Sequence, residues 1–317
     1  MADKKIIAVV GATGAQGGGL VRAILEDKSG EFKARALTRN VNSDKAKALA
    51  NAGAEVVAAD VDNVESLKKA FEGAYGVYAV TFFWEHFSPE KEKQHAKNMA
   101  EAAKQAGVKH IIWSSLDDTR KWIPLSDDRM PTLQDNYKVP HFDAKGESNK
   151  YFIESGVPTT IFNTVFYWEN FIYFGQGPQK GPDGQIIFSI PMADKKFPSI
   201  AAEDIGKCAF GIFKSGDKYK GKTVGIAGEH LTGNQFAEAF SKALGKEVVY
   251  KPVTPDVYRS FDFPGADDMG NMYQFKAEFE EDYCKSRSIE LAKSLNPSLQ
   301  SFESWVEKNK DKIQLGN

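Results

Sequence analysis

The sequence predicts an α/β fold in which a doubly wound parallel sheet is followed by a smaller α+β lobe. Short runs rich in β-branched residues alternate with helix-like segments in the N-terminal part of the chain. A glycine-rich turn directly follows the first of these runs, and the alternation fades after residue 163. Such alternation is typical of parallel strands covered by helices on both faces.

The strands are predicted from short apolar runs bounded by polar or turn-forming residues. The first run, 6–10, follows two lysines, and glycines interrupt it too early for the apolar core of a secretion signal. The remaining strands are expected at 33–37, 55–58, 77–81, 110–113 and 159–163.

Helices are expected between these strands, where apolar residues recur at helical spacing. Their predicted ranges are 18–26, 44–52, 64–71, 89–106 and 143–155. The polar segment 116–140 breaks the rhythm, and a loop of this length inside an α/β domain is more often functional than not. We therefore expect this segment to cover a cleft.

The C-terminal part has a different pattern, with frequent glycine and proline at 175–184. Helices are expected there at 234–244, 268–280 and 302–308, and a strand at 247–250. We therefore expect a first domain over 1–165 and a smaller lobe over 166–317, whose chain can cross back to the first domain.

Composition excludes several classes of function. The 317 residues carry a net charge of −2 without a Lys/Arg-rich stretch, which argues against direct nucleic-acid binding. No apolar run is long enough to span a bilayer, so no membrane association is expected. Cys208 and Cys284 lie far apart without a CxxC pattern, so neither a metal site nor a disulfide framework is predicted. A reducing, cytoplasmic location is expected.

The turn after the first strand reads GATGAQG over residues 11–17 and opens a predicted helix. Glycines at this spacing permit a tight turn, close approach of the backbone to a pyrophosphate, and close packing of helix on strand. The N-terminus of the helix then offers free N–H groups and a positive dipole end to phosphates. This strand–turn–helix predicts a dinucleotide site of the Rossmann type.

The end of the second strand indicates which dinucleotide is bound. Arg39 stands where an acid would bind the 2′-hydroxyl of NAD, and a guanidinium can instead pair with the 2′-phosphate of NADP. The alternative is a solvated arginine without a ligand. Asp60 closes the third strand and can reach the adenine rim or simply form a turn. Residues 81–83 end the fourth strand and can line the cofactor or pack in the core.

Several segments resemble the NmrA-like family of atypical short-chain dehydrogenases/reductases. They are GATGAQG at 11–17, LTRN at 37–40, GAEVV at 53–57, HFDAKGE at 141–147, YWEN at 167–170 and FPGA at 263–266. The similarity runs nearly the full length and is greatest to an NADPH-sensing member of that family. It implies a Rossmann domain with NADP(H) lying across the carboxyl edge of its sheet.

The resemblance also implies roles for individual residues along the cofactor. The pyrophosphate would be held by Gly11, Ala12, Thr13, Gly14, Ala15 and Gln16, the 2′-phosphate by Arg39 and Asn40, and adenine by Asp60 and Val61. The middle of the cofactor would be lined by Thr81, Phe82, Phe83 and Lys93, and the nicotinamide end by Lys145, Tyr167, Trp168, Glu169 and Asn170.

A catalytic apparatus is harder to identify. Short-chain dehydrogenases carry Tyr-x-x-x-Lys, in which the lysine lowers the pKa of the tyrosine, whereas the corresponding residues here are His141 and Lys145. In a catalytic interpretation His141 or Lys145 supplies a proton and Ser115 hydrogen-bonds the substrate carbonyl. In the alternative, Lys145 only binds cofactor and His141 merely starts a helix.

Two functions therefore stay open. The first is a redox sensor that reports the NADPH/NADP+ ratio to a regulatory protein partner, with the cofactor ordering loops such as 116–140. The second is an NADPH-dependent oxidoreductase that uses Lys145 to reduce a small apolar carbonyl, quinone or similar substrate. A homodimer is compatible with the sequence, which marks no surface for one.

Overall fold

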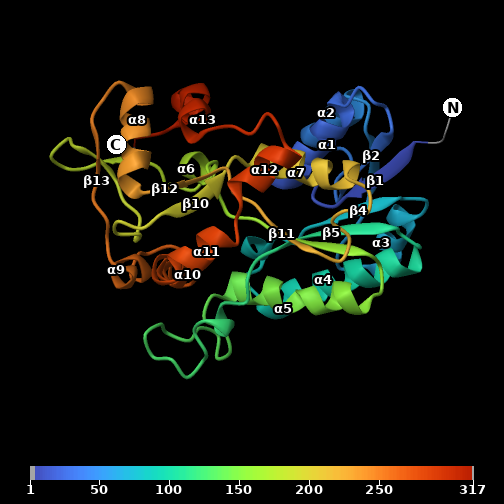
Figure 1. The fold of residues 1–317 in the computed structure, drawn as a ribbon, viewed down its shortest axis with the longest axis horizontal. Helices are drawn as coiled ribbons and strands as arrows, with labels where there is room; N and C mark the ends of the chain where they lie inside the picture. Colours follow the sequence, from blue (N-terminus) through green and yellow to red (C-terminus); the bar gives the residue numbers. More distant parts are fainter. Residues whose placement is uncertain (1–3, 316–317) are drawn as a thin grey trace. The chain divides into compact units, whose positions relative to one another are not determined.

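The computed structural model describes residues 4–315, and these residues divide into two compact units (Figure 1). The first unit comprises residues up to Asp118 together with His141–Thr164 and Ala202–Val224. The second comprises Thr119–Pro140, Val165–Ala201 and the chain from Gly225 onwards. The chain therefore passes between the units several times. The sequence predicted a main break near residue 165 and allowed the chain of the second lobe to cross back to the first domain.

The first unit is built around a seven-stranded sheet, which contains the six strands expected from the alternating pattern and a further strand, β11, that was not predicted. Its strand order is β11-β6-β5-β4-β1-β2-β3, and β1 to β6 pair in parallel. The order reverses between β1 and β4, as in a doubly wound fold. The strands are β1 (Lys5–Val9), β2 (Phe32–Thr38), β3 (Glu55–Ala58), β4 (Gly76–Ala79), β5 (His110–Ser115), β6 (Thr159–Asn163) and β11 (Thr223–Gly225).

Six helices belong to the described part of this unit. They are α1 (Ala15–Glu26), α2 (Asp44–Asn51), α3 (Val64–Phe71), α4 (Pro89–Gln105), α5 (Pro140–Glu154) and α7 (Ala202–Lys214). All but α7 follow a strand of the sheet, whereas α7 follows β10 (Phe197–Ile200) of the second unit and packs on α1. Part of the core lies between the sheet and α3, α4 and α5, where Trp113 stacks on Phe152 with ring centroids 4.5 Å apart. The predicted α/β fold class is confirmed.

Two helices begin earlier than predicted, and both matter for the site. α1 begins at Ala15 instead of 18 because its glycines continue the helix where side chains would clash. α5 begins at Pro140 instead of 143, since proline is well tolerated in a first helical turn. His141 is therefore helical and precedes Lys145 by about one turn.

The second unit contains two three-stranded sheets, β12-β10-β7 and β13-β9-β8. Their strands are β7 (Phe166–Tyr167), β8 (Gln179–Lys180), β9 (Ile186–Phe188), β10 (Phe197–Ile200), β12 (Glu229–Leu231) and β13 (Val248–Tyr250). The helices are α6 (Asn170–Tyr173), α8 (Gly233–Leu244), α9 (Pro255–Arg259), α10 (Ala266–Glu278), α11 (Glu280–Lys285), α12 (Ile289–Leu295) and α13 (Phe302–Asn309). Two short 3-10 turns of this unit are η2 (Thr119–Lys121) and η3 (Lys310–Lys312), whereas η1 (Phe83–Glu85) lies in the first unit.

Aromatic side chains form much of the core of this second unit. Phe171 contacts the rings of Phe188, Phe236 and Phe302, and Phe302 stacks on Trp305. Phe171 therefore lies among aromatic side chains of this core. Within residues 4–315, none of the helices combines the length and apolar character needed to cross a bilayer.

The segment 119–140 packs against α10 of its own unit. Lys138 is completely buried, and its ammonium donates to the carbonyls of Asp127 and Met130 at 2.7 Å each. The Asn271 amide donates to the carbonyls of Pro131 and Lys138. These hydrogen bonds connect the segment to α10 and satisfy its buried polar groups.

Candidate functional site

The glycine turn after β1 forms a cradle open to solvent. Gly11 adopts φ +65°, and Gly11, Gly14 and Ala15 are exposed. A Cβ atom on Gly17 would lie 2.5 Å from the carbonyl oxygen of Gly11, so no larger residue fits there. Gly14 caps α1 without any side-chain hydrogen bond to the helix. The first turn of α1 is therefore shaped to receive an external anion.

Gln16 connects this cradle to the neighbouring strands. Its side-chain oxygen accepts hydrogen bonds from the hydroxyl of Tyr78 on β4 and, at 2.8 Å, from that of Ser114 on β5. The backbone N–H of Ala12 donates to the carbonyl of Leu37 on β2 at 3.3 Å. Thr13, between them, is half-buried. The turn is thus fixed to strands on both sides of β1.

The predicted adenosine end gathers at the carboxyl edges of β2 and β3. Arg39 is largely exposed, and its Nη1 lies 2.6 Å from Glu85 Oε1. That carboxylate, followed by the charges of Asp60 and Asp62, raises the pKa of Arg39. Asn40 accepts a hydrogen bond from the backbone of Asn42, as Asp60 does from Asp62. The Val61 carbonyl accepts from Asn98.

Residues 81–83 follow β4 at the same edge of the sheet. Thr81 and Phe83 are buried, whereas Phe82 leaves 57% of its surface exposed. Lys93, on α4, lies 2.8 Å from Glu90 and 3.6 Å from Glu147. Phe82 is therefore the apolar side chain of this group that a ligand can reach directly.

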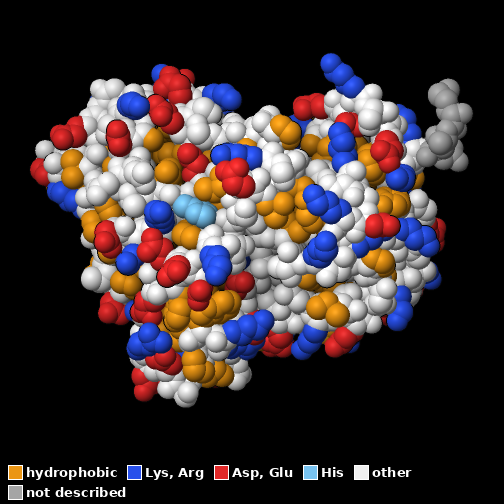
Figure 2. All heavy atoms as spheres, in the orientation of Figure 1, with side chains coloured by type: hydrophobic (Ala, Val, Ile, Leu, Met, Phe, Trp, Pro, Cys, Tyr) orange, Lys and Arg blue, Asp and Glu red, His pale blue; other side chains and the backbone are white. Residues whose placement is uncertain are grey.

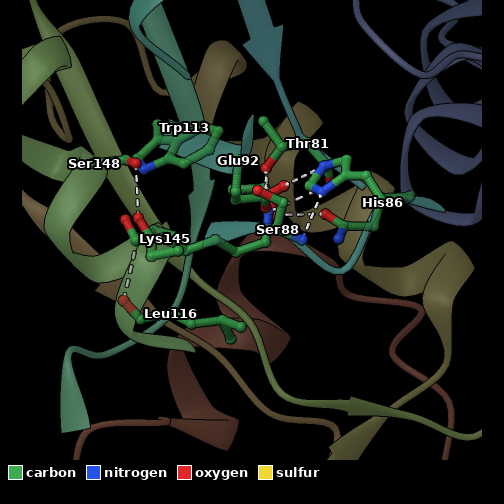
Figure 3. A network of polar contacts seen from close by, with 12 residues as sticks. Thr81, His86, Ser88, Glu92, Trp113, Leu116, Lys145 and Ser148 are labelled. Carbon is green, nitrogen blue, oxygen red and sulfur yellow. Dashed lines mark hydrogen bonds and ion pairs between the residues drawn. The ribbon is translucent and has the colours of Figure 1, made fainter. Parts of the chain in front are cut away.

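Lys145 on α5 is the centre of a buried polar network (Figure 3). Its Nζ lies 2.8 Å from Glu92 Oε1 and also donates to the hydroxyl of Thr81. The ammonium stands 5.1 Å from the ring centroid of Trp113, which adds a cation–π contact. Lys145 retains 12% side-chain exposure, whereas Glu92 retains none. The ammonium thus covers a carboxylate that is sealed from solvent.

Glycine at position 146 allows this placement of Lys145. A Cβ atom there would lie 2.4 Å from the backbone nitrogen of Asp118. α5 can therefore pack directly on the chain that leaves β5, which brings Lys145 to the carboxyl edge of the sheet.

Glu92 is ionised despite its burial. Burial raises its pKa, but the charge of Lys145, the contact with His86 and the hydrogen bonds from Lys145 and Thr81 lower it more, leaving a pKa of about 2. The backbone N–H of Ser88 donates to His86 Nδ1 at 3.0 Å, which leaves Nε2 to face the carboxylate. That nitrogen stands 3.4 Å from Glu92 Oε2. Lys145 and His86 therefore flank the carboxylate, each facing a different oxygen.

Glu92 and His86 were missed from the sequence. Glu92 lies in the first turn of α4, where an acidic residue is commonly explained by the helix dipole. One feature of the sequence could have indicated Glu92. It lies in the first turn of the helix that follows the fourth strand, and that turn begins near the carboxyl edge of the sheet, where Thr81 lies. Only the three-dimensional structure brings α4 and α5 together around it.

His141 and Ser115 lie near Lys145 but have other contacts. The His141 ring packs among aromatic rings, 4.8 Å from Trp84 and 6.0 Å from Phe83 between centroids. Ser115 is completely buried, and its hydroxyl donates to Asn149 Oδ1 at 2.7 Å. The proton-transfer role of His141 and the carbonyl-binding role of Ser115 stay predictions, and the structure gives both side chains packing partners.

The expected nicotinamide-end segment, Tyr167, Trp168, Glu169 and Asn170, belongs to the second unit. Trp168 is fully buried there, donates to Ser199 Oγ at 2.7 Å, and contacts Phe302 and Trp305. Tyr167 is half-buried and pairs with Ile200 on β10. The indole of Trp168 thus lies in the core of the second unit. The role of all four residues as cofactor contacts stays a prediction.

The described residues contain no cluster of metal-ligating side chains. On the face drawn in Figure 2, basic and acidic side chains are interspersed without a large patch of one sign. This distribution provides no electrostatic footprint for a nucleic acid on that face.

The amino-acid sequence was compared with those of known protein families and proteins. Residues 3–306 match the model of the NmrA-like family. The chain is 34% identical to an NmrA-like family domain-containing protein of Dictyostelium discoideum, covering 82% of this chain and 84% of that protein. It is 30% identical to the NmrA-like family domain-containing oxidoreductase FrzB of a Cladobotryum species, covering 85% and 83%.

Among solved structures, the chain is similar to NmrA, a negative transcriptional regulator. The structure of NmrA in complex with NADP has a TM-score of 0.78 and 25% sequence identity, covering 96% of this chain and 95% of that one. NmrA has also been solved in complex with NAD.

Proposed function

The chain belongs to the NmrA-like family, and from this membership and the site geometry we propose that it is an NADP(H)-binding regulator responding to the NADPH/NADP+ ratio. The resemblance to the NADPH-sensing member HSCARG, which runs nearly the full length of the chain, stays a prediction that agrees with this proposal. A regulatory protein partner and a homodimer are also proposals.

The residues present fit the cofactor. The cradle has no room for a side chain at Gly17, the N-terminus of α1 has no side-chain cap, and Arg39 is exposed at the end of β2. Gly11–Gln16 would hold the pyrophosphate and Arg39 the 2′-phosphate, while Lys145 would contact the nicotinamide ribose. NADPH, when bound, supplies a hydride. The similar protein NmrA binds both NADP and NAD.

The arrangement around Lys145 is the observation that carries the regulatory proposal. Its ammonium is directed to Glu92 and Thr81, and the residue one turn earlier is His141, packed among aromatic rings. A short-chain dehydrogenase needs a phenol beside its lysine to exchange protons with substrate. Here the lysine has a carboxylate partner instead, which suits orienting a ribose better than activating an acid.

The chain path offers a route from the cofactor to the second unit. It leaves the first unit after Asp118 and returns at His141, and Gly146 packs closely on the backbone of Asp118. A cofactor that contacts Lys145 would therefore lie close to Asp118 and His141, the residues at which the chain leaves and re-enters the first unit. A redox response further requires that NADPH and NADP+ bind the two conformations differently.

The test combines calorimetric measurement of cofactor binding with measurement of backbone hydrogen exchange in the bound states. Calorimetry should detect NADPH and NADP+ binding to the wild-type chain, and Arg39→Ala should reduce the preference for NADP over NAD. Hydrogen exchange at residues 116–118 and 140–145 should differ between the NADPH and NADP+ complexes. Identical protection in the two complexes would refute the redox response, and absence of binding would refute the whole proposal.

An NADPH-dependent reductase is the second candidate, favoured by the presence of Lys145 at the carboxyl edge and by the name oxidoreductase carried by FrzB. Incubation with NADPH and a panel of quinones and aldehydes tests it. Substrate-dependent oxidation of NADPH by the wild type, lost in Lys145→Ala, would replace the regulatory proposal with this one.

A further inference from the structure

Arg39 is already paired with an acid of its own chain. Glu85 ends η1, the short turn after β4, and its Oε1 lies 2.6 Å from Arg39 Nη1. The two side chains keep 48% and 66% of their surface exposed, respectively, so a ligand can reach both. An incoming 2′-phosphate would meet a guanidinium that has a carboxylate partner.

Other charges around Arg39 add to this competition. Asp60 and Asp62 also act on the guanidinium, although Asp62 lies against His95 at 2.8 Å and Lys91 at 3.7 Å. Glu85 is the carboxylate in direct contact with Arg39. The negative charges around Arg39 thus stabilise its guanidinium cation and disfavour the binding of a further anion beside it.

The two forms of cofactor differ in how they meet this pair. A 2′-phosphate carries about two negative charges and must displace Glu85 to bind Arg39, after which the carboxylate stays nearby. A 2′-hydroxyl is neutral and can donate a hydrogen bond to Glu85 while Arg39 keeps its partner. The pair therefore contains recognition groups for both cofactors.

We propose that Glu85 is a specificity-determining residue that competes with the 2′-phosphate for Arg39 and narrows the preference for NADP(H) over NAD(H). This inference rests on the proposed cofactor binding and deepens it. It means that the carboxylate, as well as the guanidinium, sets which nucleotide pool the chain responds to.

Isothermal calorimetry on the full chain tests the proposal, with NADP+ and NAD+ as ligands. Glu85→Gln keeps the size of the side chain and removes its charge. We expect NADP+ to bind about 3- to 10-fold more tightly to this variant, a modest change in keeping with an exposed ion pair, and NAD+ to bind equally or less tightly.

Glu31→Gln is the matched control, because Glu31 forms a similarly exposed ion pair with Lys5 at 2.8 Å, beside the amino end of β1. It should leave the affinities for both ligands unchanged. In an Arg39→Ala background, Glu85→Gln should lose most of its effect on NADP+, since the group for which they compete is gone.

Two results would overturn the inference. One is an unchanged ratio of NADP+ to NAD+ affinity in Glu85→Gln with an unchanged melting temperature. The other is an equal gain for both ligands, which would indicate general electrostatics. If the wild type binds neither ligand, the proposed function fails and this inference fails with it, so the two failures are distinguishable.

Discussion

The substitution Glu92→Gln removes the negative charge at the centre of the network around Lys145. Glu92 is completely buried, so the variant leaves the Lys145 ammonium without its carboxylate while the side-chain volume is preserved. A pKa lowered from 4.5 to about 2 corresponds to a contribution of about 3 kcal/mol to the free energy of unfolding at pH 7. Breaking a buried ion pair by removing one partner typically costs about 3–5 kcal/mol, which agrees.

The pH dependence provides a second, independent signature. Because the folded-state pKa of Glu92 lies below its unfolded value, its contribution is complete above pH 4.5 and is lost as the pH falls towards 2. The difference in stability between wild type and Glu92→Gln should therefore be constant from pH 5 to 7 and shrink below pH 4.5.

Urea unfolding followed by circular dichroism at several pH values measures both quantities. Glu31→Gln, which removes an exposed acid, should change the free energy of unfolding by less than about 1 kcal/mol. A Glu92→Gln protein within about 1 kcal/mol of wild type at pH 7, or a difference independent of pH down to 3, would refute this account of the buried pair.

Two further substitutions test other parts of the first unit. Burial, followed by the charge of Lys220, lowers the pKa of His110 to about 4, so stability should fall by roughly 3 kcal/mol as the pH drops from 6.5 to 4 and stay low below that. His110→Asn should remove this slope in urea unfolding, and a slope that persists would assign it to other groups. Gly146→Ala places a Cβ atom 2.4 Å from the Asp118 nitrogen and should destabilise by about 1–3 kcal/mol. It should also weaken NADPH binding in calorimetry, and unchanged affinity would show that Lys145 does not depend on this close packing.

Local patterns were enough to predict most of the first unit. The strands at 55–58 and 159–163 and the helix at 64–71 were predicted with their observed bounds, because polar or turn-forming residues flank each apolar run. The starts of α1 and α5 were predicted too late, because glycine and proline have a low propensity for helix interiors. In α1 the glycines are helical because the first turn packs closely on Gly11. In α5 the proline stands in the first turn, where it is well tolerated.

The sequence allowed the chain to cross back to the first domain, but the residues at which it does so could not be predicted. The return of 202–224 to the first unit depends on the close contact of α1 and α7, where a Cβ atom on Gly206 would lie 2.2 Å from the Leu20 nitrogen. Such a contact joins segments far apart in the chain, and no local pattern encodes it. The network around Glu92 was missed for the same reason, since its members lie on α4, α5, β5 and the segment between β4 and α4.

The charges of Lys145 and Glu92 affect how well the proposed site could distinguish NADPH from NADP+. The nicotinamide ring is cationic in NADP+ and neutral in NADPH, so a lone ammonium beside its ribose would favour the reduced form. The ionised Glu92 at 2.8 Å offsets that ammonium and keeps the two affinities closer together. If Lys145 contacts the nicotinamide ribose as proposed, Glu92→Gln should raise the ratio of NADPH to NADP+ affinity in calorimetry. An unchanged ratio would place Lys145 too far from the ring to take part in sensing.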